Sequence, residues 1–137
     1  MKNKIVLRFG IWGFEDVSHE ELSNITGITP VKIYKKGERK NPNFTALAKE
    51  NGWLFQSSDD PCLSFEHQIK DLMKTISTKK EIFKHLSKKY YLEVSCAVYI
   101  YFDTEENMPS IQLSPRYAKM LGDLKITFDI DLYCLPG

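Results

Sequence analysis

Several features that would identify a chemical class are missing from this chain of 137 residues. Its three cysteines, Cys62, Cys96 and Cys134, are odd in number and form no CxxC pair, which predicts reduced, packed thiols rather than a disulfide framework. No run approaches the ~18 apolar residues of a membrane helix. Arg8 interrupts the first apolar run and no small-residue cleavage site follows it, so we expect a cytoplasmic protein without a signal peptide.

A dominant charge is missing as well. The 19 Lys and Arg residues against 18 Asp and Glu residues leave a net charge of +1, which gives no overall attraction to nucleic acid or to a membrane. The chain also has no G-x-S-x-G elbow and no glycine-rich phosphate loop with its lysine. These absences predict a protein that is not an enzyme and that needs no cofactor.

What is present is a pattern that occurs twice, in which a strand is followed by a Ser-capped helix, a Gly and another strand. In the first copy Ser18 and Glu21 form a capping box and Gly27 is placed to end the helix. In the second copy Ser114 is the cap and Gly122 the stop. The sequence therefore predicts pseudo-repeated strand–helix–strand units at the two ends of a single α+β domain, residues 1–137.

Alternating apolar and polar residues predict the longest strands. Such alternation, with one buried face, covers residues 4–12, 90–102 and 124–133. Shorter strands are expected at 31–36, 53–56 and 111–113, with a turn at 105–107. Helices are expected after Asp60-Pro61 and at a second capping box, Thr78 with Glu81. We expect a single, largely antiparallel sheet of about five or six strands with three or four helices on one face.

A metal site receives little support from the sequence. His67 and Asp71 lie four residues apart on an expected helix and Cys62 is near them in sequence. Zinc needs three or four convergent ligands, so a solvated His67 is favoured and no metal is predicted.

Two other functions remain as alternatives. Asp129 and Asp131 share a strand face roughly 6–7 Å apart, close enough for acid–base work in a small hydrolase-like enzyme with a pocket between the sheet and loop 37–51. Lys35 to Lys40 and the lysines of 74–89 could contact phosphate in a weak nucleic-acid-binding protein.

The strongest signal is the sheet face that the helices leave bare. Trp, Tyr and Arg mixed with carboxylates are typical of a protein-binding surface, and large aromatic side chains are costly to leave uncovered. If the first, longest and last strands lie side by side, this face displays the candidate partner-binding residues Arg8, Trp12, Tyr91, Glu93, Tyr99, Tyr101, Asp129, Asp131 and Tyr133. The alternative is that the aromatics support the sheet by cross-strand pairing.

The order of several short segments also resembles a known bacterial family, that of domain of unknown function 4279. The segments are Phe9-Gly10-Ile11, Ile25 to Pro30, Lys36-Gly37-Glu38, Trp53 after the variable loop, and Asp129 to Tyr133. The resemblance spans nearly the whole chain and implies a fold, since the family has no assigned chemistry. Small bacterial proteins of this kind often resemble immunity proteins, which bind and silence a cognate toxin.

We therefore expect a protein-binding domain that neutralises a cognate bacterial toxin, such as a nuclease with a basic cleft, by occluding it. Tyr99, Tyr101 and Trp12 would anchor the partner, while Arg8 and the carboxylates of the last strand would set the register. Self-association through this face or through an edge strand remains a further alternative.

Overall fold

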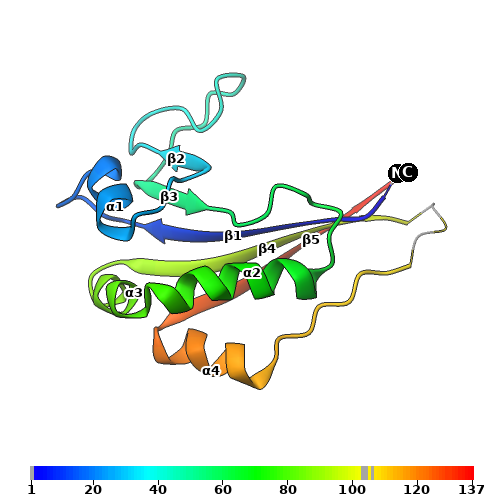
Figure 1. Cartoon of the computed structure of the whole chain (residues 1–137). Coiled ribbons are helices and arrows are strands. Elements are labelled where there is room, and N and C mark those ends of the chain that lie inside the picture. The colour runs from blue at the N-terminus through cyan, green and yellow to red at the C-terminus, as the bar shows by residue number, and fades with distance from the viewer. Residues whose placement is uncertain (1, 103–104, 106) are drawn as a thin grey trace.

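A computed structural model provides the structure of the chain, and it describes residues 2–102, 105 and 107–137. Five strands and four helices form within these residues (Figure 1). In chain order they are β1 (Lys4–Trp12), α1 (His19–Thr26), β2 (Lys32–Tyr34), β3 (Gly52–Phe55), α2 (Phe65–Thr78), α3 (Lys80–Ser87), β4 (Tyr91–Tyr101), α4 (Pro115–Asp123) and β5 (Ile126–Leu135).

The five strands form one mixed sheet in the order β2-β3-β1-β4-β5. The β2–β3, β3–β1 and β1–β4 pairs are antiparallel, but β4 and β5 run parallel over ten residue pairs, Leu92↔Ile126 to Tyr101↔Leu135. The α+β class is confirmed, whereas the expectation of a largely antiparallel sheet is wrong.

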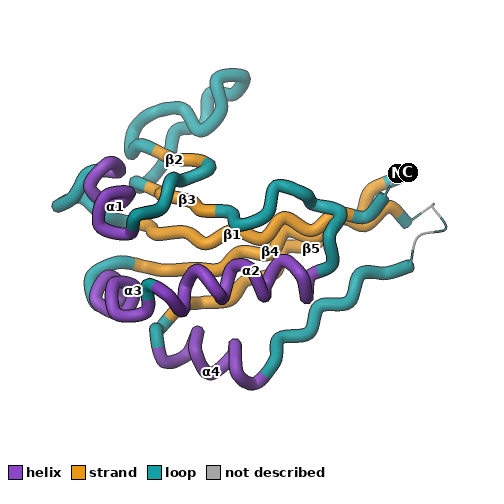
Figure 2. The backbone as a smooth tube through the Cα atoms, viewed as in Figure 1, coloured by secondary structure: helices purple, strands orange, loops and turns teal. Residues whose placement is uncertain are grey.

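The parallel pair arises from the chain between β4 and β5. Residues 111–113 form no strand, because the segment from 107 to 114 runs back alongside α2 as an extended loop (Figure 2). Ile111 and Leu113 pack partly against the core instead of pairing with β4. The expected turn at 105–107 includes Glu106, which lies outside the described residues. The second strand–helix–strand unit thus lacks its first strand, and α4 carries the chain back to the end where β4 began.

The four helices pack over one face of the sheet, and their apolar side chains form a single core with it. Phe9 of β1 meets Phe83 of α3 edge-on, with ring centroids 4.8 Å apart. Trp53 of β3 is fully buried and donates from Nε1 to Ser23 Oγ of α1. Other buried contributors include Leu22, Ile69, Leu72 and Leu121 from the helices, and Ile11, Val94 and Ile126 from the strands.

Local capping signals are confirmed at both copies of the repeated pattern. Ser18 and Glu21 form the capping box, and Gly27 ends α1 in the left-handed conformation at φ 69°. Ser114 Oγ accepts from the backbone N–H of Tyr117, with Pro115 at the start of α4. Gly122, however, lies inside α4, and the positive φ of 56° belongs to Lys125. The expected glycine stop is therefore wrong in the second copy.

The two other expected helix starts are also wrong. The chain turns at Asp60, whose carboxylate accepts from the N–H of Cys62, and α2 begins only after its cap Ser64. Thr78 is the last residue of α2 and bonds back to the carbonyl of Thr75. The break between α2 and α3 has no side-chain cap. A capping pattern therefore needs a free helix end before it can act.

Candidate binding surface

The side chains of β1, β4 and β5 that point away from the helices form a surface that we call the open face. The register places them in cross-strand rows: Lys4–Tyr99–Tyr133, Val6–Ala97–Asp131, Arg8–Ser95–Asp129, Gly10–Glu93–Thr127 and Trp12–Tyr91. Tyr101 continues β4 beyond the first row. All of the candidate binding residues predicted from the sequence therefore lie on one face of three adjacent strands.

One end of the open face is an aromatic platform that lies flat on the sheet. The Trp12 indole covers two glycines: a Cβ built on Gly52 would lie 2.5 Å from Trp12 Cζ3, and one on Gly10 would lie 2.7 Å from Trp12 Nε1. The Trp12 ring also stacks on Tyr34 of β2, with centroids 5.7 Å apart and planes at 18°. Trp12 is thus partly buried as a cover for the sheet, rather than projecting as an anchor.

The other end of the open face carries a second aromatic group. Tyr99 and Tyr133 occupy one row of the β4–β5 ladder and stack with centroids 5.0 Å apart and planes at 14°. Tyr133 is exposed and Tyr99 is partly buried. Four row spacings along β1, about 26 Å, separate this pair from Trp12. In the rows between, the small residues Gly10, Ser95 and Ala97 form what we call the central strip, and longer side chains such as Arg8 and Glu93 border it.

Three carboxylates line the strip on its β5 side. Asp129 and Asp131 are exposed on β5, and Glu93 is partly buried on β4. Burial raises the pKa of Glu93, and the nearby charge and hydrogen bond of Asp129 raise it further, with a smaller contribution from Asp131. The carboxylates therefore repel one another, and this part of the surface is suited to a cationic group from outside.

Arg8 does not serve as that cation. Its Nε donates to Gln56 Oε1 at 3.0 Å, and Gln56 in turn donates to the Ser58 carbonyl at 2.6 Å. These bonds hold the guanidinium toward β3, on the side of β1 away from β5. Arg8 and the aspartates are thus brought to the same face, but the contacts of Arg8 lead away from them.

The pocket expected for a hydrolase-like enzyme is not formed. Loop 37–51 joins β2 to β3 at one edge of the sheet, while Asp129 and Asp131 lie on β5 at the other edge. Three strands separate the two. A groove of about 690 Å³ lies instead on the helix side, between the start of α2, segment 107–114 and the start of α4. None of the candidate residues lines it.

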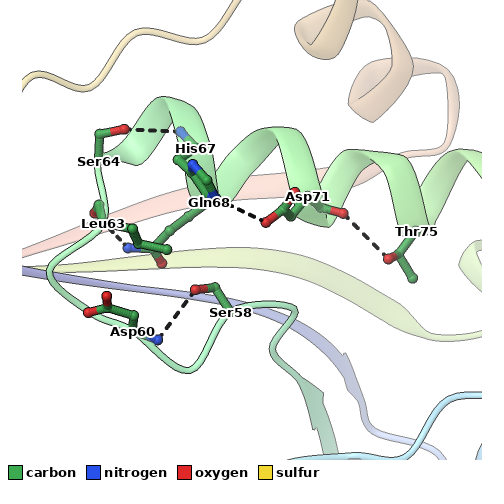
Figure 3. A network of polar contacts seen from close by, with 8 residues as sticks. All are labelled: Ser58, Asp60, Leu63, Ser64, His67, Gln68, Asp71 and Thr75. Atoms are coloured by element: carbon green, nitrogen blue, oxygen red, sulfur yellow. Dashed lines mark hydrogen bonds and ion pairs between the residues drawn. The ribbon is translucent and has the colours of Figure 1, made fainter.

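His67 lies on the surface of α2 and contacts side chains of that helix and its cap. Its Nε2 lies 3.5 Å from Asp71 Oδ2, and its backbone N–H is bonded to the Ser64 cap (Figure 3). No group of three or more potential metal-ligating His, Cys, Asp or Glu side chains gathers within the part of the chain that the structure describes. The neighbouring Gln68 is buried and donates to the carbonyls of Ile5 and Leu63, which ties α2 to β1.

The cysteines follow the sequence expectation only in part. Cys96 is buried beneath the helices, and burial raises the pKa of its thiol to about 11. Cys62 and Cys134 are exposed free thiols, so packed thiols were wrongly expected at those two positions.

Sequence reasoning missed several residues that shape the open face. Tyr34, Gly52 and Gln56 come from β2 and β3 or the chain just after it, which were not among the strands placed side by side. The Gly-Trp sequence at 52–53 was a usable signal, since a glycine within a strand often marks a close approach by a neighbour.

Comparison with known proteins identifies one family. The model of the family described as "Domain of unknown function (DUF4279)" matches residues 3–135. No curated protein and no solved structure matches the chain. Among the described residues, no helix has both the length and the apolar character needed to cross a membrane.

Proposed function

The chain belongs to the DUF4279 family, and from that premise we propose that it is a non-enzymatic domain whose open face binds a protein partner. The observation that carries the proposal is the composition of this uncovered face. Stacked aromatic pairs lie at its two ends, and three carboxylates lie along one side, where burial and then the neighbouring Asp129 raise the pKa of Glu93. Aromatic side chains supply contact area at little entropic cost, and the carboxylates favour a basic partner.

In its specific form, the proposal is that the protein is an immunity protein that neutralises a cognate bacterial toxin by covering a basic site on it, such as the cleft of a nuclease. Tyr99 and Tyr133 would supply the contact area, and Asp129 and Asp131 the charge. Binding would take place in the cytoplasm, where the exposed thiols of Cys62 and Cys134 would stay reduced.

The arrangement of the lysines favours a protein over a nucleic acid as the partner. The lysines of 74–89 lie on α2, α3 and the turn that follows, on the helix side of the sheet, whereas Tyr99 and Tyr101 lie on the open face. The carboxylates beside these tyrosines would repel phosphate. The lysines of 74–89 and these tyrosines thus lie on opposite sides of the sheet, although Lys4 and Arg8 are also on the open face.

The proposal is tested with the product of the adjacent gene, co-expressed and then titrated against the purified protein. A toxic product that is tolerated only beside this protein supports the immunity role. Tyr99→Ala and Asp131→Ala should each weaken the complex about tenfold or more, as expected for residues central to an interface. Lys74→Ala, on the helix side, serves as the control and should bind like the wild type.

Circular dichroism and urea unfolding establish that each variant is folded before its affinity is interpreted. If both open-face variants bind the partner with wild-type affinity, the open face is not the interface. If the neighbouring product is harmless without this protein, the immunity role is wrong.

A further inference from the structure

The outer edge of β5 presents a row of backbone groups that pair with no other strand. β5 is the last strand of the sheet and is hydrogen-bonded only to β4 within the described residues. The N–H of Phe102 donates to the carbonyl of Leu135, so the odd-numbered residues of β5 direct their backbone groups toward β4. The N–H and carbonyl groups of Phe128, Ile130, Leu132 and Cys134 therefore point outward. Such an edge is a template for an additional strand.

The side chains on the helix side of the same edge are apolar and uncovered. α4 covers only the beginning of β5, where Ile126 is buried and Phe128 meets Phe65 edge-on. Beyond that point Ile130 is 42% exposed and Leu132 64% exposed, and Cys134 is also exposed. Covering such apolar side chains with a neighbouring strand is favourable, because it removes apolar surface from water.

The other side of this edge carries the charge of the open face. Asp129 and Asp131 alternate with the apolar row. After burial, their charges contribute to raising the pKa of Glu93 on the adjacent strand. The ion pairs found among the described residues join Lys36, His67, Lys89 and Lys119 to other carboxylates. Within the described residues, Asp129 and Asp131 thus take part in none of these ion pairs, and Ile130 and Leu132 on the other side of the edge are exposed.

We infer that the outer edge of β5 binds an extended segment of the partner protein as a sixth strand, with basic side chains beside Asp129 and Asp131 and apolar side chains beside Ile130 and Leu132. This inference rests on the proposed function and specifies how part of the partner is recognised. Backbone hydrogen bonds supply affinity in this mode, and the alternate side chains supply specificity.

A second copy of this chain fits the edge less well. In a two-fold antiparallel pair, residues on the same side of the sheet must face one another. The registers of greatest overlap are then centred on Ile130 or on Asp131. The first sets Asp129 opposite Asp131 of the second copy, and the second sets Asp131 opposite itself. Like charges directly opposite one another destabilise a strand pair.

The inference is tested with a peptide that does not depend on knowing the partner. The probe is a capped, fluorescein-labelled peptide of alternating lysine and valine, nine residues long, and the control replaces each lysine with glutamate. The lysine peptide should bind in fluorescence anisotropy at low salt, with an affinity at least tenfold above that of the glutamate peptide and reduced by added salt. Equal binding of the two peptides, or no binding of either, would overturn the inference.

Matched substitutions at one position separate the backbone from the side chain. The N–H of Leu132 points outward, so Leu132→Pro removes a donor for the incoming strand without removing one from the β4 ladder. Leu132→Thr shortens the apolar side chain but keeps the N–H. Leu132→Pro should lose peptide binding by tenfold or more, whereas Leu132→Thr should lose less. Equal affinities for the two variants would contradict a sixth strand.

Amide hydrogen exchange on the wild-type protein keeps the test decisive if Leu132→Pro fails to fold. The lysine peptide should slow exchange at Ile130, Leu132 and Cys134, and leave the amide of Tyr133, which faces β4, unchanged. Sedimentation equilibrium tests whether the edge binds a second copy instead. If the wild-type protein is a dimer that Leu132→Thr or Leu132→Pro dissociates, and no peptide binds, then the edge pairs with its own copy and the inference is wrong.

The same variants distinguish failure of this inference from failure of the proposed function. If Tyr99→Ala weakens the complex with the neighbouring product while Leu132→Pro does not, the open face binds the partner and the sixth strand is wrong. If the peptide binds at the β5 edge but Tyr99→Ala and Asp131→Ala leave the complex intact, the edge is a binding site and the proposed interface is wrong.

Discussion

β1 and β5 lie on either side of β4 and have the same alternating sequence pattern, yet their surroundings differ. On the helix side of β1, the side chains of Ile5, Leu7, Phe9 and Ile11 are all buried. The corresponding side chains of β5 become exposed after Phe128. β1 has β3 and β4 as neighbours, whereas within the described residues β5 pairs with β4 alone.

The difference shows what alternation in a sequence can and cannot indicate. Period-two alternation identifies which residues share a face of a strand. Whether that face is covered, and whether the strand has a second neighbour, depends on segments far away in the chain. In β5 the exposed part coincides with the carboxylates of the open face, and this coincidence is the basis of the proposed interface.

The largest contrast between the covered and the exposed part of the sheet should appear in the reactivity of the cysteine thiols of β4 and β5. Cys96 and Cys134 both lie on the helix side, but Cys96 is buried and burial raises its pKa to about 11. An aromatic disulfide reagent should modify Cys134 and the exposed Cys62 on the order of a thousandfold faster than Cys96, because Cys96 reacts only when the core opens. Mass mapping of the labelled peptides identifies each site. In urea the three rates should converge, and similar rates without urea would mean that the core over β4 is open.

Truncation of one helix-side residue in each strand, buried in β1 and exposed in β5, gives the next largest contrast. Phe9→Ala should lower the free energy of unfolding by about 3–5 kcal/mol, because it leaves a cavity against Phe83. Leu132→Ala should lower it by no more than about 0.5 kcal/mol, since the side chain is already in solvent. Urea unfolding followed by circular dichroism measures both. Equal losses would show that β5 is covered in solution.

A single methyl group added beneath the Trp12 ring should have a smaller effect on the free energy of unfolding. A Cβ at Gly52 would overlap the Trp12 ring, so Gly52→Ala should cost about 1–3 kcal/mol and shift the indole N–H resonance of Trp12. Gly122→Ala is the matched control, because nothing lies within 4 Å of its Cβ position. In the interior of α4 this change should stabilise the protein by up to about 1 kcal/mol. If Gly52→Ala is also neutral, Trp12 does not lie on the sheet.

The smallest effect is expected at the carboxylates between β4 and β5. Because burial and then Asp129 raise the pKa of Glu93, the folded state holds its proton more tightly than the unfolded state does. The ionised Glu93 therefore opposes folding at pH 7, and this penalty fades as the pH falls through its raised pKa toward the ordinary value of 4.5. Glu93→Gln should raise the free energy of unfolding at pH 7 by about 0.2–1 kcal/mol.

Urea unfolding of Glu93→Gln and of the wild type at pH 7 and pH 4 provides the measurement. The gain should shrink at pH 4, where the wild-type side chain is largely protonated. A gain of the same size at both pH values would point to packing rather than charge.

Much of the local structure was predictable from the sequence, and the predictions that failed share a cause. Ser18 and Ser114 cap their helices as expected, since a cap bonds within three residues of itself. Thr78 carries the same signal but lies at the end of α2, where tertiary packing joins two helices almost without a break. Segment 111–113 has strand-like alternation, yet its apolar residues pack on the core and leave the backbone unpaired with β4.

The candidate site divides in the same way. Alternation was sufficient to place Tyr99, Asp131 and the other predicted residues on one face. It was not sufficient to show that Trp12 lies flat, because that depends on Gly52, which is brought opposite by the β1–β3 register. The bond of Arg8 to Gln56 likewise depends on a distant segment.

The sequence by itself determined the serine caps of α1 and α4 and the two faces of each long strand, because these depend on bonds and geometry within a few residues. Only the tertiary structure decided which strands are neighbours, that β5 runs parallel to β4, and that its outer edge stays open. The physical reason is that strand pairing joins residues far apart in the chain, and α4 is long enough to cover only the beginning of β5.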